Sequence, residues 1–325
     1  MNNRGTIKAV GLLSGGLDST LAVKLMIDQD VDVTVLNFVT PFCTCTRKGC
    51  EHEATRVAKL FGLPLKTISG GREYIDMIKS PKYGYGKNMN PCIDCRIFMF
   101  RKAKQFMEES GAHFIFTGEV LGQRPMSQYK KALKIIDMES DLENLVVRPL
   151  SSKLLKPTIP EEKGWIDREK LLAIQGRRRL PQMELADKLG IKDYPCPAGG
   201  CRLTDSTFAK RLRESFDYNE DSIKDIQLLK YGRHFRLDNG IKVVVGRNEE
   251  ENKILLRFFS KDDVMMEVIG VGSPIVLLKK SRRKEDIKKA AALCIRYSDL
   301  DDAADADLKI IYSKTNEEVV KFSLL

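Results

Sequence analysis

The stretch SGGLDST at residues 14–20 has the residue types and the spacing that can bind a phosphate. Gly15 and Gly16 stand between Ser14 and Asp18, with an apolar run before them and an apolar-periodic run after them. This order predicts a turn that joins a buried strand to a helix. Such a turn directs unpaired backbone N–H groups and the positive end of the helix toward one point, which favours an anion. Glycine also lets a ligand approach the backbone closely.

Two common phosphate-binding motifs do not match this turn, because no lysine stands next to Ser19 or Thr20 and the GxGxxG spacing is not kept. The stretch instead resembles the PP-loop of the ATP pyrophosphatase superfamily, whose members cleave ATP between the α and β phosphates and activate an oxygen as its adenylate. The resemblance implies that ATP and Mg²⁺ bind here, with Asp18 orienting the metal. The implied ATP-binding residues of the turn are Ser14, Gly15, Gly16, Leu17, Asp18 and Ser19. An ordinary glycine turn, in which Asp18 caps the helix, is the alternative.

A second group of reactive residues lies in NPCIDCR at 90–96, which contains Cys92 and Cys95. Asn90 and Pro91 precede an apolar-periodic segment, so both thiols are predicted in the first turn of a helix. The helix dipole and Arg96 are expected to lower the thiol pKa values and to raise the thiolate fraction. Thiolate is the form that attacks carbon, accepts sulfur or binds iron. Zinc, redox and iron–sulfur sites all use a CxxC pair, so the pair alone leaves these chemistries open.

Two further thiols, Cys196 and Cys201, lie in YPCPAGGCRLTD at 194–205, a proline- and glycine-rich loop that makes a poor core segment. The segment from Asn90 to Glu119 resembles tRNA 2-thiouridylases, in which a cysteine at the place of Cys95 is catalytic. The PAGGC element also resembles thiouridylase-related PP-loop proteins, with Cys201 at their cysteine position. The sequence departs from the family at Glu119, where a TGH-like strand end is usual.

The resemblance implies one of two sulfur chemistries. In iron–sulfur tRNA thiolases, three cysteines hold a [4Fe–4S] cluster whose fourth iron binds hydrosulfide, and here these would be Cys92, Cys95 and Cys201. In persulfide-type thiolases, one cysteine carries the sulfur and another resolves the disulfide. The paired Cys92 and Cys95 favour the cluster. The persulfide route, two spare thiols, and Cys196 as the third thiol stay open as alternatives.

A separate cysteine run, CTCTRKGCEH at 43–52, brings Cys43, Cys45, Cys50 and His52 within ten residues. Four sulfur and nitrogen donors so close together can form a Zn²⁺ site. Their spacing is uncommon for zinc, and a loop with spare thiols is an equal alternative.

Composition limits the class of protein. The 325 residues, 42% of them apolar, can form two or three domains. No apolar run approaches the roughly 18 residues of a membrane span, and the N-terminus lacks a secretory pattern, so we expect a cytoplasmic protein. In the cytosol the eight cysteines are better explained as ligands, catalytic thiols or core residues than as disulfides. The net charge of +10 favours a polyanionic partner.

The first 150 residues alternate strand and helix patterns. Strands are predicted at 7–13, 31–39, 65–69 and 113–118, and helices at 19–27, 53–62 and 96–111. This alternation predicts an α/β fold with a parallel sheet and helices on both faces, like that of adenine nucleotide alpha hydrolases. Ligands gather at the carboxyl ends of such strands, so Asn37 and Gly118 join Ser14 as candidate ATP-binding residues. The loop GQRPMSQ at 122–128 is expected near the nucleotide or the base, with a plain surface loop as the alternative.

The remaining chain divides into a helical, proline-punctuated linker at 151–218, which carries the Cys201 loop, and a smaller α+β domain at 219–325. Helices are predicted at 166–174 and 182–190 in the linker. Strands of a mostly antiparallel sheet are predicted at 241–247, 253–259, 264–270 and 274–278, with a helix within 279–297. Residues 1–150 would form the PP-loop catalytic domain.

The C-terminal domain resembles the NFACT-R type of RNA-binding domain, whose GRNxxxN-like signature Gly246, Arg247, Asn248 and Asn252 match. The family's Trp-His stretch is replaced by VMMEVIGVGSP at 264–274. The resemblance implies an RNA partner whose phosphates basic side chains can follow without reading sequence. The candidate RNA-binding residues are Arg177, Arg178, Lys279, Lys280, Arg282 and Arg283. A solvated basic face is the alternative.

Taken together, the resemblances imply an ATP-dependent tRNA sulfurtransferase that adenylates a uridine carbonyl oxygen and replaces it with sulfur from sulfide or a persulfide carrier protein. Asp18, Cys95 and Cys201 would be its catalytic residues. A PP-loop ligase or amidotransferase-like enzyme acting on a small molecule is the alternative in the same superfamily. An RNA-binding scaffold with a degenerate ATP site is a third, which the intact SGGLDS turn disfavours. The modified nucleoside and carbonyl, the sulfur donor and the oligomeric state stay open.

Overall fold

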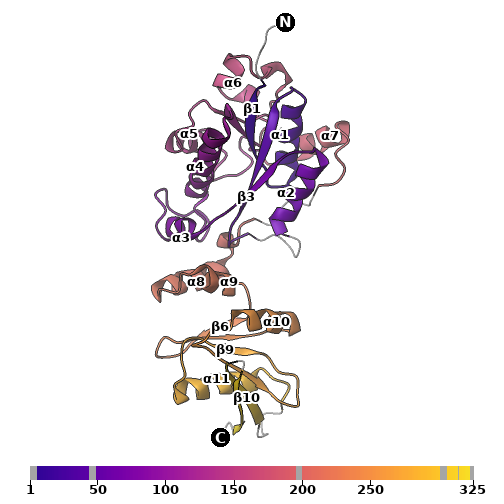
Figure 1. Cartoon of the computed structure of the whole chain (residues 1–325). Helices are drawn as coiled ribbons and strands as arrows, with labels where there is room; N and C mark the ends of the chain where they lie inside the picture. The colour runs from indigo at the N-terminus through magenta and orange to yellow at the C-terminus, as the bar shows by residue number, and fades with distance from the viewer. Residues whose placement is uncertain (1–5, 44–48, 195–199, 301–305, 314, 323–325) are drawn as a thin grey trace. The chain divides into compact units, whose positions relative to one another are not determined.

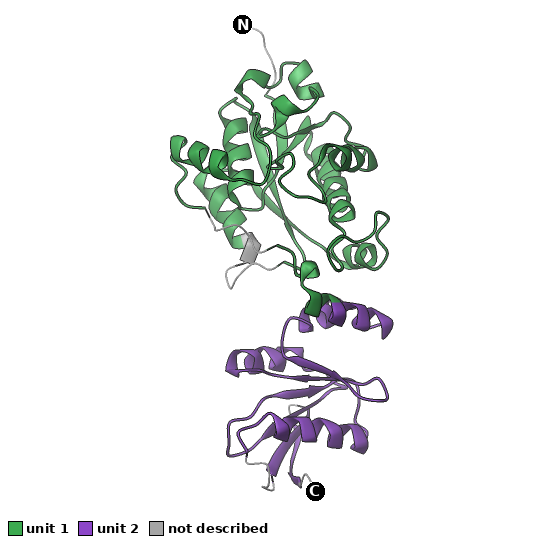
Figure 2. Ribbon diagram, turned by 180° about the vertical axis from the view of Figure 1, so that it is seen from behind, with its two compact units in different colours: residues 1–209 green, residues 210–325 purple. Residues whose placement is uncertain are grey.

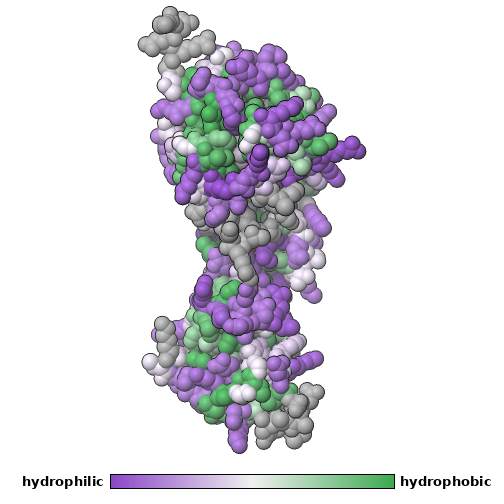
Figure 3. Space-filling model, turned by 90° about the vertical axis from the view of Figure 1, so that its right-hand side faces the viewer, coloured by the Kyte–Doolittle hydropathy of each residue, from purple (hydrophilic) through white to green (hydrophobic). Residues whose placement is uncertain are grey.

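The computed structural model describes residues 6–43, 49–194, 200–300, 306–313 and 315–322. It divides into two compact units, Met1–Ala209 and Lys210–Leu325, which are coloured separately in Figure 2. Within the described residues no helix is long and apolar enough to cross a membrane. Hydrophilic and hydrophobic side chains alternate over the face of the molecule shown in Figure 3.

The first unit is built on a five-stranded parallel sheet with the order β3-β2-β1-β4-β5. Its strands are β1 (Lys8–Leu12), β2 (Asp32–Val39), β3 (Leu65–Ser69), β4 (Phe114–Thr117) and β5 (Val146–Val147). The first four match the predicted strands closely, because each is a short apolar run bounded by polar or turn residues. The alternation of strand and helix that predicted a parallel sheet is therefore confirmed.

Helices cover both faces of this sheet (Figure 1). Successive residues of β1 point to opposite faces: Ala9 packs with α1 (Leu17–Ile27) and α2 (Gly49–Leu60), and Val10 packs with α4 (Cys92–Ser110) and α5 (Lys130–Glu139). The shorter α3 (Arg72–Lys79) contacts α4. The predicted α/β class with helices on both faces is confirmed.

The chain after the sheet stays within the first unit as far as Ala209. It forms η1 (Ser152–Leu154), α6 (Ile159–Glu162), η2 (Arg168–Lys170), α7 (Leu180–Lys188), η3 (Arg202–Thr204) and the start of α8 (Ser206–Asp217). The prediction of a helix at 166–174 is wrong, since only the single turn η2 forms there. The N–H groups of Leu172 and Ile174 donate to Pro149 and Leu150 instead of to the preceding turn, so the backbone follows that segment. Helix α7 matches the prediction at 182–190 and packs on α1.

The second unit contains a six-stranded antiparallel sheet with the order β11-β10-β8-β9-β7-β6. Its strands are β6 (Arg233–Arg236), β7 (Lys242–Val245), β8 (Val264–Val268), β9 (Val276–Leu278), β10 (Ala306–Ser313) and β11 (Asn316–Phe322). Val243 and Val245 face α11 (Lys284–Arg296), whereas Val244 faces the core beside α9 (Ile223–Leu228) and α10 (Glu249–Phe258). The antiparallel α+β domain is confirmed.

The prediction of a strand at 253–259 is wrong, because these residues belong to α10. Asn248 caps this helix, since its side chain accepts a hydrogen bond from the Glu251 N–H. Three glutamates in the first turn stabilise the positive end of the helix. The signal for this helix, its cap and acidic first turn, lies upstream of residues 253–259. The composition of residues 253–259 by themselves is typical of a strand and therefore led to the wrong prediction.

Gly118 follows β4 and lies against the first turn of α1. A Cβ atom at this position would lie 2.4 Å from the Ser19 backbone nitrogen, a distance that requires the backbone to move. We therefore expect Gly118→Ala to lower the free energy of unfolding of the first unit by about 1–3 kcal/mol. Urea denaturation followed by the fluorescence of Trp165, the single tryptophan, which packs in this unit's core, measures the change.

Gly71→Ala is the matched control, because a Cβ there would have no atom within 4 Å. It should lower the urea midpoint less than Gly118→Ala does, because Gly71 is the N-cap of α3 and only a poorer cap results. Equal effects of the two substitutions would contradict the close approach of β4 and α1.

Candidate active site

The SGGLDST turn joins β1 to α1, as the sequence predicts. Gly15 has φ +77°, and a Cβ atom there would lie 2.5 Å from Cβ of Glu53, so only glycine fits. Gly16 is the N-cap of α1 and has no side chain to satisfy the first N–H groups of the helix. The Ser19 and Thr20 hydroxyls donate to the Gly16 carbonyl at 2.9 and 3.0 Å and hold the turn in shape. The helix therefore begins with open N–H donors and a positive end, which suits a phosphate.

Asp18 lies in the first turn of α1 and is not its cap, because Gly16 holds the N-cap position. Its Oδ2 accepts a hydrogen bond from Gln123 Nε2 at 3.1 Å and lies 4.0 Å from Arg179 Nη2. Its Oδ1 is buried and has no hydrogen-bond partner among the described residues. A buried carboxylate oxygen without a partner fits a Mg²⁺ ligand. The sequence reasoning named Arg177 and Arg178 but missed Arg179, whose proximity to Asp18 arises from the tertiary fold.

Asn37 and Gly118 lie at or just beyond the strand ends where they were predicted. Asn37 is buried in β2 and its Nδ2 donates to the Leu13 carbonyl at 2.8 Å, which ties the end of β1 to β2. Its Oδ1 has no hydrogen-bond partner in the described part of the chain. Ser14 Oγ lies 3.2 Å from Ser19 Oγ, within the same turn. The structure thus brings the candidate ATP-binding residues to one edge of the sheet.

Four cysteines from three segments of the chain lie near one another, with Tyr74 beside three of them, and we call these five residues the thiol site. Cys92 and Cys95 lie in the first turn of α4, and Cys43 follows β2. Cys201 pairs with Cys43 in an isolated antiparallel bridge. The Tyr74 hydroxyl, on α3, is hydrogen-bonded to Cys95 Sγ at 3.1 Å. Tyr74 also lies within electrostatic range of Cys95, Cys201 and Cys43. Cys201 lies within electrostatic range of Cys92 and Cys95, so the predicted meeting of these distant thiols occurs.

Burial controls the acidity of these thiols. Desolvation raises the pKa of Cys92 and of Cys95, although Arg96 acts in the opposite direction on both. Burial raises the pKa of Cys201 to about 12. The prediction that the helix start and Arg96 would lower the thiol pKa values is therefore wrong, because desolvation outweighs the nearby positive charge.

Three thiols of the site each have a separate contact. Cys95 Sγ is bonded to Tyr74, Cys43 Sγ lies 3.4 Å from the Thr40 nitrogen, and Cys201 Sγ donates to the Phe42 carbonyl at 3.8 Å. Among the described residues, no group of three cysteine, histidine or acidic side chains could hold a metal ion. The described residues therefore offer no site for a single metal ion, and cluster ligation by Cys92, Cys95 and Cys201 stays a prediction. Cys45, Cys196 and the Cys50 side chain lie outside the described residues, so the zinc hypothesis also stays a prediction.

Arginines connect the thiol site electrostatically to the glycine turn. The pKa of Arg124 is lowered by desolvation and by the charge of Arg96, while Cys92, Asp18 and Glu119 act in the opposite direction. Glu119 is buried and lies 3.1 Å from Arg148 Nε and 3.4 Å from Arg96 Nε. This glutamate, where the family pattern has histidine, therefore holds the arginine that faces Cys92.

The candidate RNA-binding residues differ in exposure. Arg177 and Arg178 are exposed on the first unit, and Lys280, Arg282 and Arg283 are exposed on the second. Lys279 departs from the prediction, because its ammonium is buried and pairs with Asp263 at 2.7 Å. This ion pair stabilises the segment that enters α11 and leaves Lys279 unable to face a phosphate.

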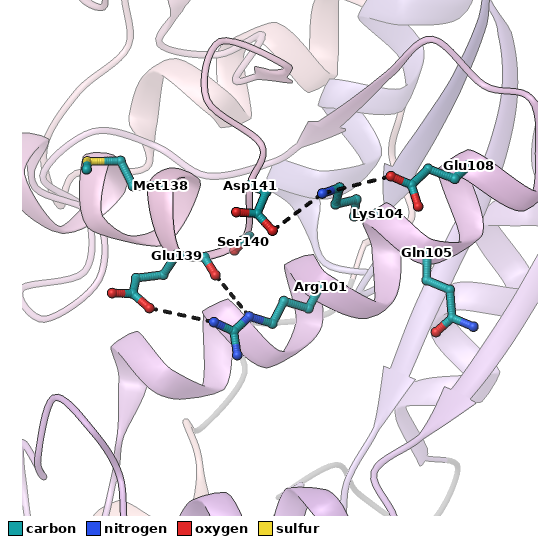
Figure 4. A pocket seen from close by; sticks show the side chains of 8 residues that line it. All are labelled: Arg101, Lys104, Gln105, Glu108, Met138, Glu139, Ser140 and Asp141. Atoms are coloured by element: carbon teal, nitrogen blue, oxygen red, sulfur yellow. Dashed lines mark hydrogen bonds and ion pairs between the residues drawn. The ribbon is translucent and has the colours of Figure 1, made fainter.

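A surface pocket of about 550 Å³ lies between α4 and α5 (Figure 4). Arg101 pairs with Glu139 and Lys104 pairs with Asp141 across it. The residues that line it include neither a thiol nor a member of the glycine turn. It is therefore separate from the candidate active site.

Both predicted family resemblances are confirmed by comparison with known families. Residues 5–159 match the ThiI family model (Thiamine biosynthesis protein), and residues 232–324 match the NFACT protein RNA binding domain. Residues 5–159 are therefore similar to the ThiI family, and residues 232–324 are similar to the RNA-binding domain of NFACT proteins.

Curated relatives are tRNA-specific 2-thiouridylases. The chain is 24% identical over 335 residues to MnmA 1 of Caldanaerobacter subterraneus subsp. tengcongensis, which covers 94% of this chain and 87% of that protein. It is 22% identical over 241 residues to MnmA of Listeria monocytogenes, which covers 71% of this chain. The match spans 62% of the Listeria protein, less than two thirds of its length.

Solved structures of thiolation enzymes are also similar. A 4-thiouridine synthetase in complex with RNA and bound ATP shares 22% identity with a TM-score of 0.39, over 69% of this chain and 52% of that chain. U34-tRNA thiolase NcsA from Methanococcus maripaludis, with its [4Fe–4S] cluster, shares 16% identity with a TM-score of 0.36, over 72% of this chain and 75% of that chain.

The hydroxyl of Tyr74 should make Cys95 more reactive. It can donate a hydrogen bond to the Cys95 thiolate and favours the charged form, so it lowers the pKa that desolvation raises. We expect Tyr74→Phe to move the pH profile of Cys95 alkylation upward and to slow alkylation several-fold at neutral pH. Iodoacetamide labelling read by peptide mass spectrometry measures Cys95 separately from the other thiols.

Tyr85→Phe is the control, since the Tyr85 hydroxyl donates to the Ile78 carbonyl at 2.6 Å. It should leave the Cys95 profile unchanged. If Tyr74→Phe gave the same profile as the unsubstituted protein, the hydrogen bond would have no influence on Cys95.

Proposed function

We propose that this protein is an ATP-dependent tRNA sulfurtransferase that acts in the cytoplasm, adenylates a uridine carbonyl oxygen and replaces that oxygen with sulfur. The main observation in support is that the thiols of Cys92, Cys95 and Cys201 gather at one site, which Arg124 couples electrostatically to Asp18 of the glycine turn. Adenylation needs the phosphate-binding glycine turn and sulfur transfer needs the thiols, so the reaction requires the turn and the thiols to lie near each other. The names of the relatives agree with this proposal.

ATP binds at the start of α1 in this proposal. The open N–H groups of the turn and the positive helix end hold the phosphates, which favours departure of pyrophosphate. Asp18, with its unpartnered Oδ1, would hold the Mg²⁺, which supplies stabilisation of the charge that develops on the phosphates. Gln123 fixes the other carboxylate oxygen and so orients Asp18.

Adenylation makes the later sulfur attack feasible. A uracil carbonyl oxygen is a poor leaving group, whereas AMP leaves readily because its phosphate tolerates negative charge. Arg96 places positive charge near Cys92, and Arg124 lies within electrostatic range of both Cys92 and Asp18. These charges would stabilise the negative charge that the departing phosphate gains. Each step is then easier than direct exchange of oxygen for sulfur.

Cys95 delivers the sulfur in the proposed reaction. Its thiol is hydrogen-bonded to Tyr74 and faces the Arg96 charge, so loss of its proton is favoured by two groups that act against desolvation. In the persulfide route, the Cys95 thiolate attacks the outer sulfur of a persulfide carrier protein, which forms a persulfide on Cys95 and releases the carrier as its thiolate. Sulfide would be the sulfur source only for the cluster. A [4Fe–4S] cluster on Cys92, Cys95 and Cys201 is the alternative sulfur-binding form. Iron content and colour after anaerobic purification distinguish the persulfide route from the cluster, because a protein with the cluster would contain iron and be brown.

The second unit binds the tRNA. Exposed Lys280, Arg282 and Arg283 surround the entry to α11, where side chains can contact phosphates in any sequence. The Arg282 Nη2 donates to the carbonyls of Lys261 and Tyr312, which holds its guanidinium in place.

Removal of the Cys95 thiol should separate ATP binding from sulfur transfer. We expect Cys95→Ala to bind ATP as well as the unsubstituted protein, because the glycine turn is unchanged, but to form no thionucleoside. Mass spectrometry of tRNA nucleosides from a deletion strain that carries the variant measures the product. Cys294→Ala, in the core of the second unit, is the control and should restore the product. Full thiolation by Cys95→Ala would remove Cys95 from the mechanism.

Loss of two exposed cations should weaken tRNA binding. We expect the double variant Lys280→Ala/Arg283→Ala to lower the affinity for tRNA about tenfold at low salt. The slope of log affinity against log salt concentration should fall by the amount expected for the loss of up to about two phosphate contacts. Filter binding at several salt concentrations measures both quantities. Lys289→Ala is the control, because Asp238 already pairs with this lysine at 2.5 Å. An unchanged salt dependence in the double variant would place the tRNA elsewhere.

A further inference from the structure

Tyr129 is an exposed aromatic residue that directly follows the loop at 122–128, and 41% of its surface is exposed. Within the described part of the chain, its hydroxyl has no hydrogen-bond partner and its ring contacts no other aromatic ring and no cation. Gln128, the residue before it, is buried, and its Oε1 has no hydrogen-bond partner among the described residues. The packing of the described chain therefore makes no use of the Tyr129 ring.

The loop before Tyr129 connects this residue to the candidate active site. The Gly122 N–H donates to the Gln128 carbonyl at 2.6 Å and closes the loop, so Tyr129 leaves it beside Gly122. Within the same loop, Gln123 Nε2 donates to Asp18 Oδ2 at 3.1 Å. A group that binds on the Tyr129 ring is therefore held at the edge of the sheet where the glycine turn lies.

Two lysines follow Tyr129 at the start of α5. Lys130 and Lys131 are exposed and form no ion pair with a described residue, and the first turn of α5 has no acidic side chain. Positive charge at this end of a helix opposes the helix dipole. Tyr129 is the N-cap residue and its side chain makes no capping hydrogen bond, although serine, threonine, aspartate or asparagine would stabilise the helix there. These residues therefore do not serve the stability of α5, and their charge suits an anion.

Two arginines lie on the other side of the same loop. The Gly176 N–H donates to the Leu121 carbonyl at 2.7 Å, and a Cβ atom on Gly122 would lie 3.6 Å from the Gly176 nitrogen. Arg177 and Arg178 follow directly, are exposed and form no ion pair with a described residue. Positive charge therefore flanks the Tyr129 ring on two sides.

We propose that Tyr129 stacks an unpaired RNA base next to the target uridine, and that the flanking cations contact the phosphates on either side of that base. This proposal rests on the sulfurtransferase function proposed above and adds a contact on the first unit to the one on the second. Single-stranded nucleic acid is bound by an aromatic ring among cations, because every base has a face that stacks and every nucleotide carries a phosphate. A base inside a duplex cannot stack on Tyr129, since its neighbours cover both faces. Tyr129 therefore selects an unpaired segment and holds the neighbouring uridine at the glycine turn.

The test uses the full-length protein and an unstructured RNA of about twelve nucleotides whose uridines are 5-iodouridine, with neither ATP nor a sulfur source present. Under ultraviolet light we expect an iodinated base to cross-link to Tyr129, which peptide mass spectrometry locates. Tyr129→Leu should lower the affinity for this RNA about tenfold, as expected for the loss of one stacked base. The slope of log affinity against log salt concentration should stay unchanged, because no charge is removed. Tyr129→Phe keeps the ring and should keep the affinity.

Further variants separate stacking from charge. Lys130→Ala/Lys131→Ala should lower both the affinity and the salt slope, because phosphate contacts are lost. Met138→Ala is the matched control, since Met138 is also an exposed residue of α5 but lines the separate pocket between α4 and α5. It should leave the affinity unchanged. Duplex RNA of the same length should bind the unsubstituted protein and Tyr129→Leu equally.

Three results would overturn the proposal: equal affinity of Tyr129→Leu and the unsubstituted protein for the unpaired RNA, the same loss of affinity in Tyr129→Phe, or cross-links confined to the second unit. A protein that binds RNA through Tyr129 but thiolates no tRNA would overturn only the function proposed above.

Discussion

The candidate active site depends on the parallel pairing of β1 with β2 on one side and β4 on the other. This pairing brings three carboxyl ends to one edge of the sheet, where the chain leaves each strand for a turn. Asn37 ties the end of β1 to β2 through the Leu13 carbonyl, and Gly118 lets the end of β4 approach the Ser19 backbone. A side chain at Gly118 would force α1 and β4 apart, so the position of the helix start depends on a missing Cβ atom.

Burial and charge compete at the thiol site. Desolvation favours neutral thiols, while Arg96 favours thiolates at Cys92 and Cys95. Glu119 holds Arg96 next to the buried Arg148, so the positive charge has a fixed position. An arginine fixed in this way can stabilise negative charge as it develops during a reaction without rearranging first. The neutral resting thiols also limit unwanted reactions of the site between turnovers.

Polar and charged groups of the second unit serve two different purposes. Lys279 and Asp263 form a buried pair that fixes the chain before α11, and the neighbouring Lys280 stays exposed. Neighbours in a basic run therefore have different roles, because the turn before the helix directs one inward and the next outward. Charge counting along the sequence cannot make that distinction. The NFACT match locates the domain, and the structure distinguishes its exposed cations from a buried one.

The sequence by itself determined the features that depend on local order. The glycine turn, the strands of the first sheet and the position of Cys92 and Cys95 at a helix start follow from hydrophobic periodicity and turn residues, which act between near neighbours. Local composition failed at 253–259, because the cap that starts α10 lies upstream of the β-branched and aromatic residues. Only the tertiary structure decided that Tyr74 bonds Cys95, that Cys43 faces Cys201 and that Arg179 reaches Asp18. These contacts join residues far apart in the chain, and the burial that raises the thiol pKa values exists only after the whole unit has packed around them.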